Sequence, residues 1–171
     1  MARVALVTGG TRGIGAAISK ALTAAGYKVA ATYAGNDAAA DKFKAETGIP
    51  AFKWDVSSFD ACVAGVKKVE AELGPVDVLV NNAGITKDGA FHKMTLDQWN
   101  SVINTNLGSL FNMTRQVIEG MRARKFAASS ISPRSTAKKA SLDRSTIRRP
   151  RPVTLVSPRP WRWKTPRPAL P

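Results

Sequence analysis

The feature that most restricts the fold is a glycine-rich turn near the start of the chain. Residues 3–9, "RVALVTG", form a β-branched run that ends in glycine. Apolar residues then recur at helical spacing, at Ile14, Ile18, Leu22 and Ala25. The sequence therefore predicts a strand, a tight turn and a helix. This order of elements begins a βαβ unit, in which the helix covers one face of a parallel sheet.

The same alternation continues along the chain. We expect strands at 28–33, 51–56 and 76–82, helices at about 36–47 and 58–73, and a long helix at about 95–123. Right-handed crossovers place such helices on both faces of a parallel sheet. We therefore predict an α/β fold with a doubly wound, Rossmann-like sheet of order 3-2-1-4-5. That order includes a fifth strand, but we expect none in this chain. The sheet is therefore expected to be incomplete, with the strand at 76–82 as an exposed edge.

The composition changes near Phe126. Residues 1–126 carry 15 Lys and Arg against 11 Asp and Glu, whereas residues 127–171 carry 11 against 1. All 13 glycines precede Phe126, and 8 of the 10 prolines follow it. We therefore divide the chain into a folded domain, 1–126, and a disordered basic tail, 127–171.

Cysteine content and hydropathy exclude several classes of protein. Cys62 is the only cysteine, so we expect no disulfide within the chain, no cysteine-based metal cluster and no other metal site. We expect its thiol to pack in a helix. No apolar stretch approaches the ~18 residues that a membrane span needs, and "VALV" is too short for a signal-peptide core. The sequence predicts a cytoplasmic protein without a membrane partner.

The glycine turn has the chemistry of an anion site. Gly9, Gly13 and Gly15 let a pyrophosphate approach the backbone, where the N–H groups and dipole of the following helix favour negative charge. A tight turn without a ligand is the alternative, since a glycine triplet alone is weak evidence. The spacing, TGxxxGxG, differs from the common GxGxxG.

Four motifs in order narrow the choice. "TGGTRGIG" is followed by Asp55 and Val56 after the third strand, by "NNAG" at 81–84, and by Asn106 in "NTNLG". Together they resemble the short-chain dehydrogenase/reductase family over residues 1–126. "YAGND", "FHKMT" and "VINTNL" are similar to bacterial members that use NADPH to reduce acetoacetyl-CoA to 3-hydroxybutyryl-CoA for polyhydroxybutyrate synthesis. Members that reduce 3-oxoacyl-ACP in fatty acid synthesis are the nearest alternative.

The resemblance implies a role for each matching position. The three glycines would hold the pyrophosphate, Asp55 and Val56 the adenine, and Asn82 to Gly84 the ribose and nicotinamide side. The full set implied for the cofactor is Gly9, Arg12, Gly13, Ile14, Gly15, Gly35, Asp55, Val56, Asn82, Ala83, Gly84, Ile85 and Thr86. The resemblance also implies a homotetramer with the helix at 95–123 in its interface, and an acyl thioester as substrate.

The choice between NAD and NADP has a physical argument. An NAD enzyme usually places a carboxylate at the end of the second strand to accept from the ribose 2′-OH. Here that strand ends "ATYAGN", with no acid before Asp37. Arg12 can instead pair with a 2′-phosphate through its guanidinium. NADP is therefore the predicted cofactor, although Arg12 as a solvated loop charge is the alternative.

Three further residues have implied roles. Asn106 matches the asparagine that helps to hold a water in the family's proton relay, and a helix-interior amide at a local kink is the alternative. Asp88 and His92 would lie near the entrance for the acyl substrate. His92 is expected to be structural or exposed, as a lone histidine usually is.

The family's catalytic serine, tyrosine and lysine are missing. The only tyrosines are Tyr27 and Tyr33, and no Tyr-x-x-x-Lys occurs. "SSIS" at 129–132 lacks the strand that would present a serine. Hydride transfer to a ketone leaves an alkoxide that needs a positioned acid. We therefore expect this chain to be a truncated and inactive form of such a reductase. The alternative hypothesis is a fragment that binds a dinucleotide without catalysis.

The genetic code offers an explanation for residues 127–171. Suppose that one base is lost directly after the codon for Phe126. Synonymous codons for residues 127–133 then allow the shifted frame Arg-Ile-Val-Asn-Ile-Ser, and those for residues 145–152 allow Asn-Tyr-Ser-Ala-Ala-Lys-Ala. The shifted frame thus contains the missing strand, serine and Tyr-x-x-x-Lys. We interpret 127–171 as frameshifted.

A nucleic-acid-binding arm is a third reading of the tail. Its eleven cations would bind phosphates, and Trp161 and Trp163 would stack on bases. We expect no evolved binding of this kind, because the shifted frame explains the same residues.

Overall fold

The computed structural model describes residues 2–124 and 128–131, which form a five-stranded parallel sheet of order β3-β2-β1-β4-β5. The doubly wound α/β prediction is confirmed. The elements are β1 (Val4–Val7), α1 (Gly13–Ala24), β2 (Lys28–Tyr33), α2 (Asp37–Thr47), β3 (Ala51–Lys53), α3 (Phe59–Leu73), β4 (Val76–Asn81), the 3-10 turn η1 (Phe91–Lys93), α4 (Leu96–Ile103), the π-helical segment η2 (Asn104–Gly108), α5 (Ser109–Ala123) and β5 (Ala128–Ile131).

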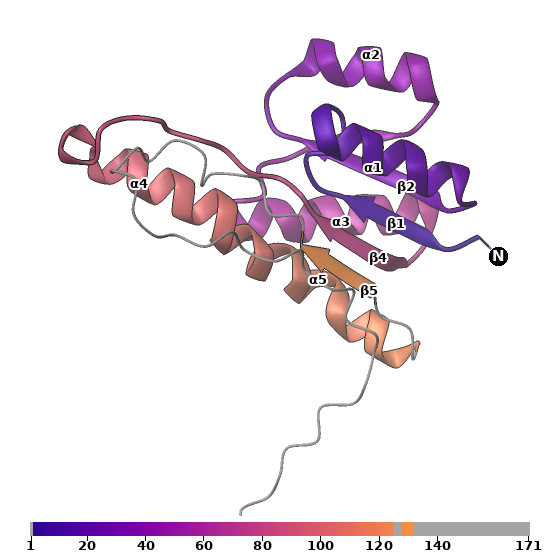
Figure 1. Cartoon of the computed structure of the whole chain (residues 1–171). Coiled ribbons are helices and arrows are strands. Elements are labelled where there is room, and N and C mark those ends of the chain that lie inside the picture. The colour runs from indigo at the N-terminus through magenta and orange to yellow at the C-terminus, as the bar shows by residue number, and fades with distance from the viewer. Residues whose placement is uncertain (1, 125–127, 132–171) are drawn as a thin grey trace, which may run out of the picture.

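Helices cover both faces of the sheet (Figure 1). Alternate residues of a strand point to opposite faces, so each strand supplies two cores. On one face α3 and α5 pack on a cluster that includes Leu6, Leu79 and Met113. On the other face α1 and α2 pack on a cluster that includes Val7, Val29 and Phe43. The central strands are therefore apolar on both sides, as buried parallel strands are.

Local signals determine where the helices begin and end. Asn36 and Ser58 accept hydrogen bonds from the backbone of the first turns of α2 and α3. Thr95 and Gln98 form a reciprocal capping box at the start of α4. Gly48 ends α2 in the left-handed conformation, with φ 67°.

Three sequence-based expectations need correction. The strand expected at 51–56 ends at Lys53, because the chain turns away from β2 to enter α3. The long helix at 95–123 contains a π-helical segment, residues 104–108. The expectation that the sheet lacks a fifth strand is wrong, because residues 128–131 pair with β4 in parallel register, from Val78 with Ala128 to Asn81 with Ile131. β4 is therefore not an edge.

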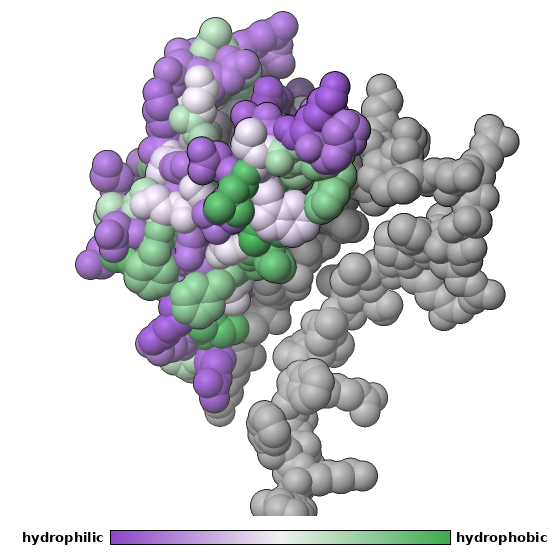
Figure 2. All heavy atoms as spheres, turned by 90° about the vertical axis from the view of Figure 1, so that its left-hand side faces the viewer, coloured by the Kyte–Doolittle hydropathy of each residue, from purple (hydrophilic) through white to green (hydrophobic). Residues whose placement is uncertain are grey.

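The side of the molecule that carries α4 exposes apolar side chains among polar ones (Figure 2). They recur at helical spacing along α4, η2 and the start of α5, which gives one stripe. The stripe consists of Leu96, Trp99, Ile103, Leu107 and Phe111. Among the residues described, no helix is long and apolar enough to cross a membrane.

Candidate functional site

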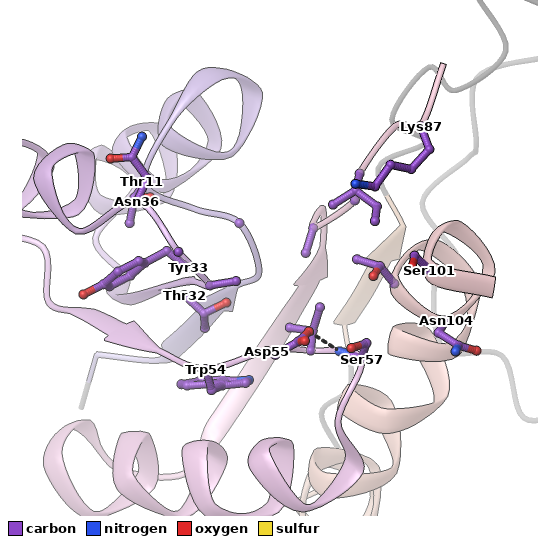
Figure 3. A pocket seen from close by; sticks show the side chains of 18 of the residues that line it. Thr11, Thr32, Tyr33, Asn36, Trp54, Asp55, Ser57, Lys87, Ser101 and Asn104 are labelled. Atoms are coloured by element: carbon purple, nitrogen blue, oxygen red, sulfur yellow. Dashed lines mark hydrogen bonds between the residues drawn. The ribbon is translucent and has the colours of Figure 1, made fainter. Parts of the chain in front are cut away.

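A cavity of about 670 Å³ opens at the carboxyl ends of the strands (Figure 3). The strand order reverses between β1 and β4, and ligands of doubly wound sheets bind at such switch points. The walls of the cavity come from the glycine loop, the end of β2, the turn after β3, the loop after β4 and the α4–η2 region. The residues are Gly9, Thr11, Arg12, Thr32, Tyr33, Ala34, Gly35, Asn36, Trp54, Asp55, Val56, Ser57, Ala83, Gly84, Ile85, Lys87, Asp97, Asn100, Ser101, Asn104 and Thr105.

The glycine loop can be built only from glycine at key positions. Gly9 and Gly13 have φ of 62° and 53°, in the left-handed region. A β-carbon on Gly15 would lie 2.0 Å from the carbonyl oxygen of Gly9, so the first turn of α1 lies directly on the loop. The first turn of α1 contains no acid and receives no side-chain cap from Arg12. This helix end is therefore suited to an external anion.

A polar clamp joins the ends of β1 and β4. The Thr8 hydroxyl accepts hydrogen bonds from the backbone N–H groups of Asn82 (2.9 Å) and Ala83 (3.0 Å). The Asn82 side-chain amide donates to the carbonyl oxygens of Thr8 (3.0 Å) and Gly9 (3.2 Å). Because Asn82 is buried, these bonds fix the glycine loop against the segment that follows β4.

The end of β2 determines the charge around one end of the cavity. Asp37, the first acid after β2, pairs with Lys53 at 2.8 Å, and this contact lowers the pKa of Asp37. Burial, and then a hydrogen bond to Asp37, raises the pKa of Tyr33. Asp37 does not line the cavity, whereas Arg12, Tyr33 and Asn36 do. The glycine loop and the end of β2 therefore contribute a cation and neutral polar groups to the lining, while Asp55 lines the cavity from the turn after β3.

One buried hydroxyl at this end needs a partner. Thr32 is 1% exposed and lines the cavity. Its Oγ1 has no hydrogen-bond partner within the described part of the chain. Since a buried polar atom is costly to leave unpaired, the atom suits a polar ligand. The glycine cradle, this hydroxyl and the nearby cation together fit a dinucleotide.

Asn106 lies in the π-helical segment and faces the loop after β4. Its Oδ1 accepts from the backbone N–H of Ile85 at 2.8 Å, and its Nδ2 donates to the carbonyl of Ile85 at 3.0 Å. The alternative proposed from sequence, a helix amide at a local irregularity, describes this position well. π-bulges of this kind occur frequently at functional sites.

The cavity brings together eight of the sequence-predicted residues and leaves others outside. Those that line it are Gly9, Arg12, Gly35, Asp55, Val56, Ala83, Gly84 and Ile85. Gly15, Asn82 and Asn106 support the lining through the contacts above, and Gly13 is an exposed residue of the glycine loop that does not line the cavity. Ile14, Thr86, Asp88 and His92 are exposed and do not line it. Asp88 and His92 as substrate-entrance residues remain predictions.

Sequence reasoning missed several lining residues. Thr11 lies inside the quoted glycine motif, and Thr32 to Asn36 form the end of β2 and the turn after it, so both groups had a local signal in their position. Lys87 directly follows the predicted Thr86 in the loop after β4, so it also had a local signal. The residues of α4 and η2 had none, because only the packing of that region against the cavity brings them there. The missed side chains include Thr11, Thr32, Tyr33, Asn36, Trp54, Ser57, Lys87, Asp97, Asn100, Ser101 and Asn104.

Cys62 is a packing residue, as expected. It is fully buried in α3, where its thiol lies 3.5 Å from the carbonyl of Val56. Burial raises the pKa of Cys62 to about 11, so the thiol stays protonated at neutral pH.

Part of the predicted tail is folded. Ser129 and Ser130 lie in β5, so the expectation that "SSIS" lacks a strand is wrong for these two residues. Residues 132–171, with Trp161, Trp163 and the stretch 145–152, lie outside the described residues.

Comparisons with known proteins relate the chain to dehydrogenases and reductases. The model of the short chain dehydrogenase family matches residues 3–140. The chain is 76% identical over 126 residues to the acetoacetyl-CoA reductase of Shinella zoogloeoides and 68% identical to that of Rhizobium meliloti. It is 39% identical over 125 residues to the 3-oxoacyl-[acyl-carrier-protein] reductase of Vibrio harveyi.

The matches cover only part of these relatives. The first two span 74% of this chain and 52% of each relative, and the third spans 72% and 51%. A solved structure described as a short-chain dehydrogenase from Novosphingobium aromaticivorans is 29% identical, with a TM-score of 0.67 over 71% of this chain and 46% of that one. The chain therefore spans about half the length of the relatives that it matches.

Proposed function

Since the chain belongs to the short chain dehydrogenase family, we propose that its folded part is the NADPH-binding half of an acetoacetyl-CoA reductase. One observation carries this proposal: the glycine loop, the Asp55 turn and the Ala83–Ile85 segment meet around one cavity at the switch point of the sheet. When bound, NADPH supplies the hydride that reduces the 3-keto group of the acyl thioester.

The residues of this chain would hold the cofactor along the cavity. The N–H groups at the start of α1 would bind the pyrophosphate, and Thr32 and Asp55 would accept or donate hydrogen bonds at the adenosine half. Ala83 to Ile85, fixed by Thr8 and Asn106, would border the nicotinamide half. We place this function in the cytoplasm, where an unpaired thiol such as that of Cys62 persists.

The similarity to relatives supports a CoA substrate. The two acetoacetyl-CoA reductases are 76% and 68% identical to this chain, against 39% for the acyl-carrier-protein enzyme. The residues of this chain contain no Tyr-x-x-x-Lys, which would supply the proton to the alkoxide. We therefore propose that the 171-residue chain binds NADPH but does not turn over substrate. This is the hypothesis of a non-catalytic dinucleotide-binding fragment.

Arg12→Ala tests the cofactor. Arg12 is exposed at the rim of the cavity and is free to pair with a 2′-phosphate. A charge-assisted hydrogen bond to a phosphate contributes about 1.5–3 kcal/mol. We expect the Kd for NADPH to rise about tenfold to a hundredfold and the Kd for NADH to stay unchanged, in equilibrium fluorescence titrations of the full chain. Lys20→Ala, an exposed cation on α1 outside the cavity, is the control.

Two other results would contradict the proposal. If wild-type chain binds neither nucleotide, the site is not a dinucleotide site. If Arg12→Ala weakens NADPH and NADH equally, Arg12 does not read the 2′-phosphate and NADP is the wrong cofactor.

We also propose that residues from 127 onward are translated out of frame. The curated matches extend over about 126 residues of this chain. The strand β5 reads Ala-Ser-Ser-Ile, with one large apolar residue, whereas the shifted frame supplies three β-branched residues. Parallel strands in such sheets are usually rich in these.

Sequencing the gene across the codons for Lys125 to Ser130 tests this hypothesis. We expect one additional base directly after the codon for Phe126, and we expect the corrected gene to yield NADPH-dependent reduction of acetoacetyl-CoA. An unchanged base sequence would mean that the deletion lies in the gene itself, and insertion of one base after the Phe126 codon should then restore the reductase. A gene restored in this way that yields no turnover would contradict the hypothesis.

The apolar stripe on α4 and α5 supports the family's homotetramer as the assembly of the corrected protein. Leu96, Leu107 and Phe111 are 72%, 61% and 65% exposed in the single chain. A contiguous apolar face of this kind marks an interaction surface.

A further inference from the structure

The turn after β3 forms one wall of the cavity, through Asp55, Val56 and Ser57. Its own hydrogen bonds determine its shape. The backbone N–H of Ser57 donates to Oδ1 of Asp55 at 2.8 Å, and the N–H of Ser58 donates to the Asp55 carbonyl at 3.2 Å. These bonds fix the turn internally, but they do not fix its position relative to the sheet.

Asn112 supplies that second constraint from a distant part of the chain. It lies on α5, and its single Nδ2 donates to the carbonyl oxygens of both Val56 and Ser57, each at 3.0 Å. A primary amide nitrogen has two hydrogens, one for each carbonyl. Neither a carboxylate nor an apolar side chain can replace it.

The neighbouring residue reinforces the contact. The ring of Phe111 stacks on the ring of Phe59, with centroids 6.2 Å apart and planes 26° apart. Phe59 begins α3 directly after the turn. Two consecutive residues of α5 therefore contact the segment that carries Asp55. The only other side-chain donor to these carbonyls in the described residues is the Cys62 thiol, a weak donor 3.5 Å from Val56.

We propose that Asn112 is a positioning residue for the adenosine half of the cofactor. It holds the backbone of residues 56 and 57 and thereby determines where Asp55 and Val56 present their polar groups to the cavity. This inference rests on the proposed function, since it names a further residue of the same site. Asn112 itself does not line the cavity, so its effect passes through the turn.

Asn112→Leu tests the proposal, because leucine keeps the branched arrangement of four side-chain heavy atoms, with bulkier methyl groups, and removes both donors. In the full chain we expect the Kd values for NADPH and for adenosine 2′,5′-bisphosphate to rise by a similar factor, about tenfold, since displacement of a site by about 1 Å weakens recognition strongly. Gln116→Leu is the matched control. Gln116 lies one turn further on α5, and among the described residues its amide donates only to the Asn112 carbonyl, at 2.9 Å. We expect its Kd values to equal those of the wild type.

The readouts separate positioning from general stability. If Asn112→Leu lowers Tm but leaves both Kd values unchanged at a temperature well below Tm, the proposal is wrong. If Gln116→Leu raises the Kd values as much as Asn112→Leu, the proposal is also wrong, because any loss of an amide on α5 would then suffice.

A ligand-free measurement keeps the test independent of the proposed function. Amide hydrogen exchange in residues 56–58 should be faster in Asn112→Leu than in the wild type and unchanged in Gln116→Leu. If wild-type chain binds no nucleotide, the proposed function fails while this result still supports Asn112 as the anchor of the turn. Unchanged exchange in Asn112→Leu would overturn the anchor itself.

Discussion

Gly15→Ala is expected to abolish nucleotide binding and to destabilise the domain by at least ~3 kcal/mol. The added β-carbon would lie 2.0 Å from the Gly9 carbonyl oxygen and 2.6 Å from Nδ2 of Asn82. Both neighbours are fixed, because Nδ2 of Asn82 donates to that carbonyl. The loop must therefore move away from α1, and the N–H groups that would bind the pyrophosphate move with it.

Urea unfolding of the full chain and titration with NADPH measure the two effects. Gly35→Ala is the matched control, since Gly35 also lines the cavity, has an ordinary φ and has no atom within 4 Å of an added β-carbon. We expect it to change the free energy of unfolding by no more than about 1 kcal/mol. A Gly15→Ala variant with wild-type stability and wild-type Kd would show that the loop adapts.

Asn82→Asp is expected to cost about 3–5 kcal/mol at pH 8. Asn82 is 2% exposed, and its amide donates to the carbonyls of Thr8 and Gly9. An ionised carboxylate in that place has no hydrogen to donate and faces two carbonyl oxygens. The same surroundings raise the pKa of the introduced carboxyl above its unfolded value, because burial and repulsion both disfavour the charged form.

The sign of the pH effect follows from that raised pKa. The loss of stability relative to the wild type is largest above the folded-state pKa and becomes smaller as the pH falls through it, because the protonated acid regains one donor. Urea unfolding of both proteins between pH 8 and pH 5 measures the difference. A loss that stays constant with pH would contradict this account.

Asn36→Asp is the control for the same chemical change. Asn36 caps α2 by accepting from the N–H of Ala39 at 2.9 Å, and aspartate caps a helix equally well. We expect a change within about 0.5 kcal/mol at pH 8. Its helix-end position lowers rather than raises the carboxyl pKa, so any benefit should shrink on acidification.

Local patterns determined most of the fold. Most strands and helices up to Ala123 follow from apolar periodicity and from punctuation such as Gly9, Asn36 and Gly48, because these signals act within a few residues of where they occur. The early end of β3, the 3-10 turn at 91–93 and the π-helical segment at 104–108 had no such signal. The glycine loop was equally readable, since the restrictions at Gly13 and Gly15 arise from backbone conformation and close approach. The strand order followed from the known order of doubly wound folds, once the alternation of strands and helices had indicated such a fold.

The sequence alone determined a doubly wound sheet, a dinucleotide-type glycine loop, the family and the absence of Tyr-x-x-x-Lys. The tertiary structure decided what depends on contacts between distant segments. It paired residues 128–131 with β4 and placed Asn104 on the cavity. It also paired Asp37 with Lys53 and brought Asn112 into contact with the turn that carries Asp55. In the last of these contacts, Asn112 and Val56 lie 56 positions apart in the sequence. No local periodicity encodes contacts of this kind. They exist only once both layers of helices have packed on the sheet.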